Sequence, residues 1–459
     1  MNKLLTLALV ALAIVACSKE GTDKGINPEE GVNTYAGVNI SFPQTDTKAT
    51  DANATAVETA VTKIGVYIVD NTSGLMHSGL YSASDFEKDA SSGNYKLKTA
   101  LQTTTGDKTI YVVLNPTDKL NATIVAAGKN SFNGVVPIVG ETFVNKSGNT
   151  IESLTMSSVA GGTKQTVTAQ DKATAIANPF AVTVERNTAK VTLRFGASHT
   201  VIGGTVSDVQ YGIDIAPKQS YLIQNLKAVA AASIENVNTP ANKVAIPDPS
   251  LATADYVAYM QKFFTDSKQI PTDMTDVQAH NTAAGSLVGF YCPENVNVKN
   301  YQDNTTAVII KATYTPTTGT AITGYDTATG VTTLGDIAMG SSFYKYKTDG
   351  TLWSEAAYNA ATTAGATYSK TAADFTTIYT NGVCYYRIWV MGENTTGPGA
   401  VGVLRNNFYV MNITKINGVG TPGHPGADSK PGDQIETQCL ISVNVAMQPW
   451  TMVESNHEI

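Results

Sequence analysis

Apolar and polar positions alternate with a period of two in many short stretches of this chain. In the last clear stretch, Ile441, Val443, Val445 and Met447 alternate with smaller or polar residues. A period of two places alternate residues on the same face of a β-strand. Pro449 follows, and a residue without a backbone donor belongs at a strand end or on a sheet edge. The pattern predicts a C-terminal strand with one apolar face.

This strand has two interpretations. It is the last strand of its own domain, or it completes the sheet of another molecule. The alternation does not separate the two, because either arrangement covers one apolar face and leaves the other face polar.

The same pattern recurs along the rest of the chain. Val38, Ile40 and Phe42 alternate with polar residues and stop before Pro43. Residues 307–314 and 383–390 are longer apolar strands, and turns rich in Gly, Asn and Thr separate the strands. Helical periodicity is rare. The sequence therefore predicts an all-β fold with a few short helices, built as one β-sandwich in each half. We place the N-terminal sandwich in residues 49–230 and the C-terminal sandwich in 231–459.

The N-terminus has the pattern of an export signal. Lys3 precedes an apolar stretch over residues 4–16 that is too short to span a bilayer. It ends in Ile14-Val15-Ala16-Cys17, which resembles a bacterial lipobox, although Ile replaces the usual Leu. Residues 1–16 are then a lipoprotein signal peptide, and Cys17 is the lipidated first residue of an outer-membrane precursor. An ordinary signal peptide with an incidental Cys is the alternative.

A turn-rich loop follows the first strand. Residues 44–59 show no apolar periodicity, and Lys48 is the one basic residue between Lys24 and Lys63. An isolated basic residue in an exposed loop is where a trypsin-like protease cuts. The bond between Lys48 and Ala49 is the candidate cleavage site, and a plain linker is the alternative.

Motifs for catalysis, metals and nucleic acids are weak or missing. The net charge is −7, and no cluster of Lys and Arg offers a footprint for phosphates. The five His residues have no metal-ligand spacing. A formal GxGxxG match at residues 418–423 contains Pro422, which argues against the helix that a dinucleotide site needs. We therefore expect that the protein is not an enzyme and that it binds no cofactor, metal or nucleic acid. Cys292, Cys384 and Cys439 leave either one disulfide or none.

Three stretches resemble the fimbrillins, the subunits of type V pili of Bacteroidales. Residues 178–195, NPFAVTVERNTAKVTLRF, resemble a block late in the family's first domain. Residues 290–295, FYCPEN, resemble an aromatic-x-x-Glu-Asn signature in the second domain. Residues 385–388, 402–409 and 413–420 resemble its C-terminal part. With the lipobox and the last strand, the resemblance runs through nearly the whole chain.

The resemblance implies a fold and a mechanism. The fold is two transthyretin-like β-sandwiches. The precursor is exported as an acylated lipoprotein, and a protease removes residues 17–48 with the strand of Val38, Ile40 and Phe42. A C-terminal strand of another subunit, here the one with Ile441 to Met447, then fills the opened groove. Family members are cut after Arg, whereas no Arg occurs here before Arg186. Either a Lys-tolerant protease cuts after Lys48, or this is an uncut anchor subunit, or the cut lies elsewhere.

The implied protein is a pilus shaft subunit at the cell surface that supports adhesion and virulence. Its partners are copies of itself, other fimbrial subunits, the maturation protease, the outer membrane through the precursor's lipid, and host or bacterial surface ligands. Two alternatives stay open. One is a tip or anchor subunit of the fimbrium. The other is a monomeric surface lipoprotein that binds host protein or glycan.

Overall fold

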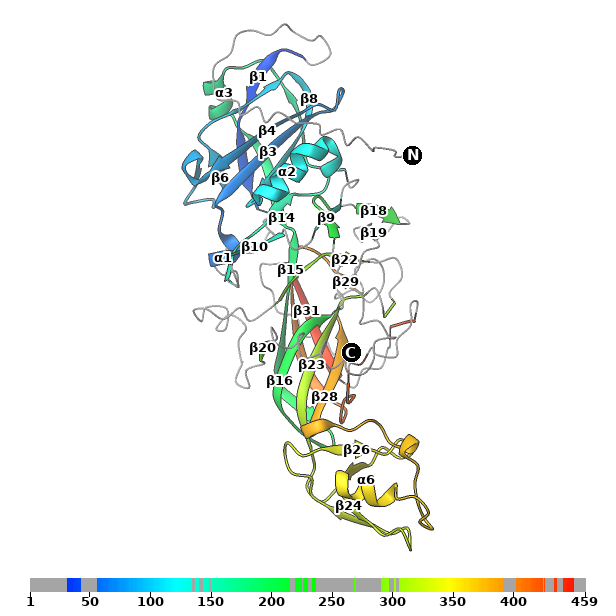
Figure 1. Cartoon of the computed structure of the whole chain (residues 1–459). Helices are drawn as coiled ribbons and strands as arrows, with labels where there is room; N and C mark the ends of the chain where they lie inside the picture. Colours follow the sequence, from blue (N-terminus) through cyan, green and yellow to red (C-terminus); the bar gives the residue numbers. More distant parts are fainter. Residues whose placement is uncertain are drawn as a thin grey trace, which may run out of the picture.

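A computed structural model describes residues 31–42, 56–133, 137–139, 143–147, 150–214, 219–224, 226–229, 233–236, 268–269, 290–296, 301–302, 305–390, 402–423, 425, 433–435 and 441–449. The described part is elongated, with three packed units arranged one after another (Figure 1). Strands dominate each unit and helices are short, which confirms the predicted all-β class.

The first unit, here called the N-terminal body, is built on a nine-stranded sheet. Its core gathers alternating apolar residues from most of these strands, among them Val38, Ile40 and Val66. The strands in sheet order are β4 (Met76–Ser82), β3 (Lys63–Asp70), β8 (Gly106–Leu114), β12 (Met156–Ser158), β14 (Phe180–Arg186), β2 (Val38–Ser41), β6 (Tyr95–Leu97) and β5 (Phe86–Lys88), and β13 (Thr163–Val167) also pairs with β8.

Smaller elements surround this sheet. The helix α2 covers a second apolar cluster with Leu120 and Ile124. Thr117 caps it, because its side chain accepts a hydrogen bond from the backbone N–H of Leu120. The helical elements are α1 (Ala56–Thr59), η1 (Ala83–Asp85), α2 (Asp118–Ala127), η2 (Gly128–Ser131) and α3 (Lys172–Ala177). The strand pairs are β1 (Asn33–Ala36) with β7 (Leu101–Thr104), β10 (Val144–Ser147) with β11 (Thr150–Leu154), β17 (Gln219–Tyr221) with β9 (Pro137–Val139), and β18 (Leu226–Val229) with β19 (Ser233–Asn236).

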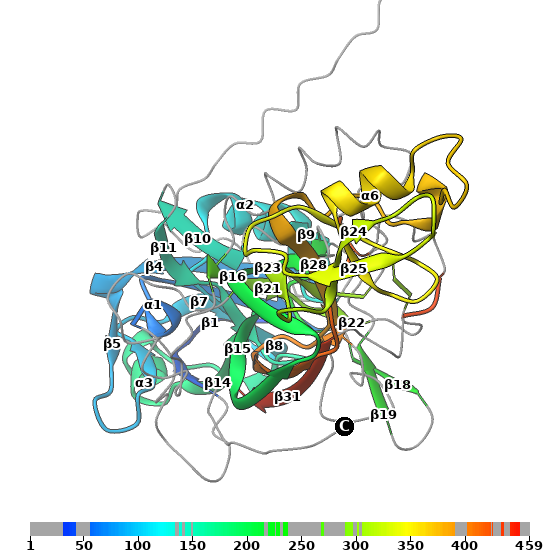
Figure 2. The same ribbon diagram turned by 90° about the horizontal axis from the view of Figure 1, so that it is seen from below.

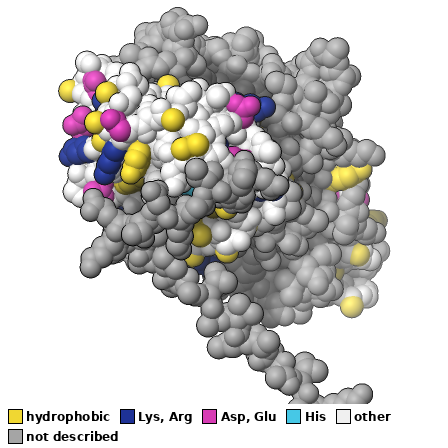
Figure 3. Space-filling model, turned by 90° about the horizontal axis from the view of Figure 1, so that it is seen from above, with side chains coloured by type: hydrophobic (Ala, Val, Ile, Leu, Met, Phe, Trp, Pro, Cys, Tyr) yellow, Lys and Arg dark blue, Asp and Glu magenta, His cyan; other side chains and the backbone are white. Residues whose placement is uncertain are grey.

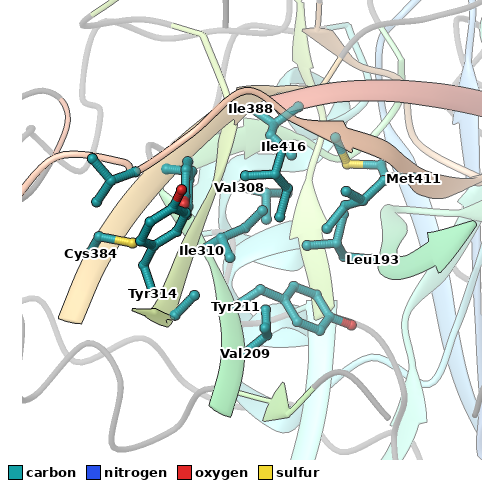
Figure 4. Packing of buried hydrophobic residues seen from close by; sticks show 14 of the residues in the cluster. Leu193, Val209, Tyr211, Val308, Ile310, Tyr314, Cys384, Ile388, Met411 and Ile416 are labelled. Atoms are coloured by element: carbon teal, nitrogen blue, oxygen red, sulfur yellow. The ribbon is translucent and has the colours of Figure 1, made fainter. Parts of the chain in front are cut away.

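The second unit is a sandwich of two four-stranded sheets. Buried side chains of both sheets point toward one another and form the largest core cluster, part of which is drawn in Figure 4. One sheet has the order β21 (Phe290–Pro293), β15 (Thr188–Val201), β30 (Asn407–Ile416) and β31 (Ile441–Pro449). The other has the order β20 (Lys268–Gln269), β16 (Gly204–Asp214), β23 (Ala307–Pro316) and β28 (Val383–Trp389), and β22 (Asn295–Val296) pairs separately with β29 (Gly402–Val403).

The third unit, here called the end unit, is inserted between β23 and β28. Viewed from below, it lies in front of the sandwich (Figure 2). Its core contains Ile322, Trp353 and Phe375. Its sheet has the order β25 (Thr332–Gly335), β24 (Ala321–Tyr325), β27 (Leu352–Ser354) and β26 (Phe343–Lys345), accompanied by α6 (Glu355–Ala361), η4 (Ala372–Asp374) and η5 (Thr380–Gly382).

The chain passes from the N-terminal body to the sandwich at Asn187, between β14 and β15. From there β15 pairs with β30 and β16 pairs with β23, so residues 188–214 share sheets with the second half of the chain. The predicted division at residue 230 lies outside the described residues and stays a prediction.

Candidate functional site

The strand that we expect to be removable lies inside the sheet of the N-terminal body. β2 runs parallel to β14, with Val38 opposite Phe180 and Ile40 opposite Val182. On its other side it runs antiparallel to β6, with Ile40 opposite Tyr95. A strand with a neighbour on each side shares its backbone hydrogen bonds with both. Its removal therefore leaves a gap between β14 and β6.

The apolar side chains of β2 fill part of the core of the N-terminal body. Val38 is 1% exposed and Ile40 is 0% exposed. Phe42, just after the strand, packs edge-on against Tyr95, with ring centroids 6.2 Å apart. Each fully buried side chain of this size contributes about 1.5–3 kcal/mol. The space that they leave is lined by apolar residues of the flanking strands, including Leu97 and Val182.

A second strand, β1, precedes β2 and was not foreseen in the sequence. Its pairing with β7 extends the buried alternation backwards, because Thr34 and Ala36 are buried like Val38 and Ile40. The Thr34 hydroxyl donates to the carbonyl of Thr168 at 3.0 Å and accepts from the backbone N–H of Gln170 at 2.9 Å. Small and polar residues carry little hydrophobic signal, so Thr34 and Ala36 gave only a faint period of two.

The predicted processing residues lie outside the described part of the chain. Cys17, Lys48 and Ala49 are all in this group. The chain is described up to Phe42 and again from Ala56, so the candidate cleavage bond falls in the segment between β2 and α1.

Helix α1, which follows that segment, is fastened to the sandwich by a buried ion pair. Glu58 is 0% exposed, and its carboxylate lies 2.8 Å from the Lys190 ammonium on β15. The Tyr291 hydroxyl donates to the same carboxylate, and Arg186 Nε donates to the Glu58 carbonyl at 3.1 Å. Burial lowers the pKa of Lys190, and the Glu58 charge opposes that shift. These contacts hold α1 independently of β1 and β2.

A second charged cluster lies at the same junction. Arg405 Nε donates to the Glu294 carboxylate at 2.9 Å, and both side chains are fully buried. Glu185, at the end of β14, lies beside this pair, and burial raises its pKa to about 7; the nearby Arg405 lowers that pKa, and Glu294 raises it. The Glu185 Oε1 atom is buried without a hydrogen-bond partner among the described residues.

The predicted donor strand lies in its own chain in this structure. β31 pairs antiparallel with β30 at the edge of the first sandwich sheet. The register places Ile441 opposite Ile416, Val443 opposite Ile413, Val445 opposite Met411 and Met447 opposite Tyr409. All four partners are buried, and directly opposed residues share one face of a sheet. In the isolated chain the apolar positions of β31 thus match the core face of β30.

Other candidate chemistry is limited in the described residues. Cys292 and Cys384 are free and buried, and burial raises their pKa values to about 12 and about 11, while Cys439 lies outside the described part. No group of three His, Cys, Asp or Glu residues in the described ranges is arranged to hold a metal ion. Among the helices that the structure describes, none has the length and apolar character needed to cross a bilayer.

Comparison with known proteins shows which proteins this chain resembles. A family model described as "Major fimbrial subunit protein type IV, Fimbrillin, C-terminal" matches residues 377–456. The minor fimbrium subunit Mfa1 of Porphyromonas gingivalis is 24% identical over 469 residues, which cover 94% of this chain and 89% of the relative. Residues 377–456 thus match the C-terminal part of the fimbrillin family, and the chain resembles a fimbrial subunit over most of its length. The protein is a fimbrial subunit related to Mfa1, and the family match includes β31.

Two solved structures are similar to this chain. A fimbrilin of Porphyromonas gingivalis aligns with 18% identity and a TM-score of 0.43, covering 92% of this chain and 99% of that one. The tip fimbrial protein Mfa3 of the same organism, with C-terminal truncation, aligns with 13% identity and a TM-score of 0.38, covering 91% and 100%.

Proposed function

We propose that this protein is a fimbrillin of the pilus shaft that polymerises by strand exchange after proteolytic removal of residues 17–48. The observation that carries the proposal is the position of β2 between β14 and β6. Removal of a strand at a sheet edge would leave only one neighbouring strand unpaired. A removable strand inside the sheet leaves unpaired backbone groups and an apolar gap that another strand must fill.

The proposed donor is β31 of a second copy. It is an edge strand with β30 as its neighbour, and edge strands are the elements that exchange most readily between molecules. Exchange would move Ile441, Val443, Val445 and Met447 from the face that they share with β30 to the core vacated by Val38 and Ile40. The shaft role follows from this pairing of a groove with a donor on one chain.

Cleavage after Lys48 would release β1 and β2 together. The first described residues beyond the predicted cut belong to α1, and Glu58 ties that helix to Lys190 and Tyr291. We therefore expect the new N-terminal region to stay attached to the junction while the groove opens.

The cleavage site is tested by the N-terminal residue of subunits recovered from assembled fimbriae. We expect Ala49 to be first. Lys48→Gln should accumulate the longer form and prevent assembly, whereas Lys24→Gln, which removes a basic residue of the same segment, should mature normally. Wild-type fibres that retain residues 17–48 would contradict the shaft proposal and favour an uncut anchor subunit.

Lipidation of the precursor at Cys17 is a separate part of the proposal. Acyl chains hold a protein to a membrane by about 0.8 kcal/mol per buried methylene. Cys17→Ala should therefore leave the precursor unacylated and reduce the number of surface fimbriae. Intact-mass measurement of the membrane precursor checks this, and an unmodified Cys17 in the wild type would contradict it.

A further inference from the structure

Gly37, between β1 and β2, makes a very close contact with α3. It is buried, and its carbonyl accepts a hydrogen bond from the N–H of Phe180 at 2.9 Å. A Cβ atom added at this position would lie 2.1 Å from the carbonyl oxygen of Ala175 and 2.9 Å from its carbonyl carbon. Contacts this short do not occur between real atoms, and the obstacle is helix backbone rather than a flexible side chain. The released segment therefore carries Gly at its tightest point.

The proposed donor has no equivalent residue. The C-terminal stretch from Gln438 to Ile459 contains no Gly. A strand that follows the path of β1 and β2 must place a side chain against the Ala175 carbonyl, and α3 must then yield. This helix has six residues, with Asp171 as its cap. The contact thus favours the chain's own removable segment over the strand of another copy until cleavage removes that segment.

The same contact restricts the register of the incoming strand. If its apolar residues point into the core, an even-numbered residue must occupy the Gly37 position. In a strand that runs in the direction of β2, Ala446 there would put Pro449 in the place of Ile40, between β14 and β6, where a strand needs its backbone N–H. Leu440 and Asn444 are bulkier than Ser442. Ser442 is therefore the residue that fits best.

We infer that the last strand of a second copy enters the groove with Ser442 against Ala175, running in the direction of β2. This inference rests on the proposed strand exchange and adds its register. Val443 then takes the place of Val38, Val445 that of Ile40, and Met447 that of Phe42. Asn444 takes the place of Asn39, opposite Lys96 on β6. Pro449 falls beyond the groove, where its missing donor costs nothing.

Disulfide mapping between subunits tests the register. The acceptor variant is Lys96→Cys, and the donor variants are Ser442→Cys, Asn444→Cys, Ala446→Cys and Gln448→Cys, all with Cys439→Ser. A shift by two residues moves a strand by about 6.5 Å, beyond the reach of a disulfide. We expect Asn444→Cys alone to give covalent ladders when fibres of the processed protein are oxidised. Cross-linking from a different donor position would overturn the register and leave strand exchange intact. Fibres that form without any of the four cross-links would contradict strand exchange at this groove.

Assembly rates test the Gly37 contact and the strand direction together. Ser442→Gly should speed polymerisation of the processed full-length chain, because it removes the side chain that meets the Ala175 carbonyl. Asn444→Gly and Ala446→Gly also add the entropy cost of ordering a Gly backbone, but they do not remove the side chain that meets the Ala175 carbonyl. These two variants should therefore not speed polymerisation. Acceleration by Ala446→Gly instead would indicate a different register or a reversed strand. Equal rates for all three variants would show that the Ala175 contact does not control entry.

Discussion

Charged side chains are buried at the junction between the N-terminal body and the sandwich, and substituting one of them should change the stability of the protein. Glu58 and Lys190 are 2.8 Å apart with side chains 0% and 1% exposed, while Lys63 and Asp118 are 2.8 Å apart with side chains 41% and 86% exposed. Removing one partner of a buried pair leaves an uncompensated charge away from water, whereas an exposed charge is solvated in either case. The two pairs should therefore respond very differently to the same substitution.

We expect Lys190→Met to lower the free energy of unfolding by about 3–5 kcal/mol, because Glu58 then stays buried without its cation. Lys63→Met, the matched control on the surface, should change it little. Urea unfolding of both variants measures the difference. Similar small effects would show that the Glu58 pair does not fasten α1 to the sandwich.

Glu185 makes the junction sensitive to pH. Its pKa is raised by burial from 4.5 to about 7 in the folded protein, so the folded state holds its proton more tightly than the unfolded state does. The stability that this gives is fully present below pH 4.5 and is lost as the pH rises through 7. The charged groups that face this carboxyl are Arg405 and Glu294.

Glu185→Gln removes this titration. The variant should therefore gain stability relative to the wild type as the pH rises from 5 to 8. Unfolding midpoints at the two pH values, with the exposed Glu87→Gln as control, measure the gain. A stability difference between variant and wild type that stays constant over this range would contradict the pKa of Glu185.

The strands β2 and β31 show what the local alternation of apolar and polar residues predicts and what it does not. The alternation of Val38 to Phe42 predicted a strand, and the structure has β2 at Val38–Ser41 with Phe42 packed beside it. The alternation of Ile441 to Met447 predicted a strand, and β31 spans Ile441–Pro449. Neither pattern predicts which strands pair with β2 and β31, because pairing joins residues far apart in the chain, such as Ile40 with Val182.

The parts of the site that the sequence did not predict have weaker local signals. β1 depends on hydrogen bonds of Thr34 with residues more than a hundred positions away. Glu58 is buried in a short helix within a stretch that reads as an exposed loop, and its partners Lys190 and Tyr291 come from two other strands. The close contact at Gly37 depends on the backbone of α3. Each of these features arises from tertiary packing.

The face of β2 that enters the core can be tested in the precursor. Ile40 is fully buried, whereas Asn39 is on the opposite face of the same strand. Ile40→Asp should destabilise the N-terminal body and loosen residues 31–42, because it puts a charge into the core. Asn39→Asp should have little effect. Limited proteolysis of the purified precursors measures the difference, and equal protection of both variants would contradict the register of β2 with β14 and β6.

The whole molecule places the proposed acceptor and donor in different units. The groove belongs to the N-terminal body, and β31 belongs to the sandwich next to it (Figure 1). A donor in one unit and an acceptor in the other suit head-to-tail growth, which forms a filament when it does not close into a ring. The described surface at the N-terminal end mixes apolar, basic and acidic side chains without one dominant kind (Figure 3). Polymerisation by the proposed strand exchange uses the interior groove between β14 and β6.

The most direct test of strand exchange uses a free peptide of residues 438–450 and the processed full-length protein. The peptide should occupy the groove and stop fibre growth, because its residues Ile441, Val443, Val445 and Met447 enter the core that β2 leaves. A peptide with Asn444→Asp should act like the wild type, and one with Val443→Asp should not, since only one face of the strand enters the groove. Fibre length measured at increasing peptide concentration gives the answer. Inhibition by the wild-type and Asn444→Asp peptides alone is the result that strand exchange predicts, and equal action of all three peptides, or of none, would contradict it.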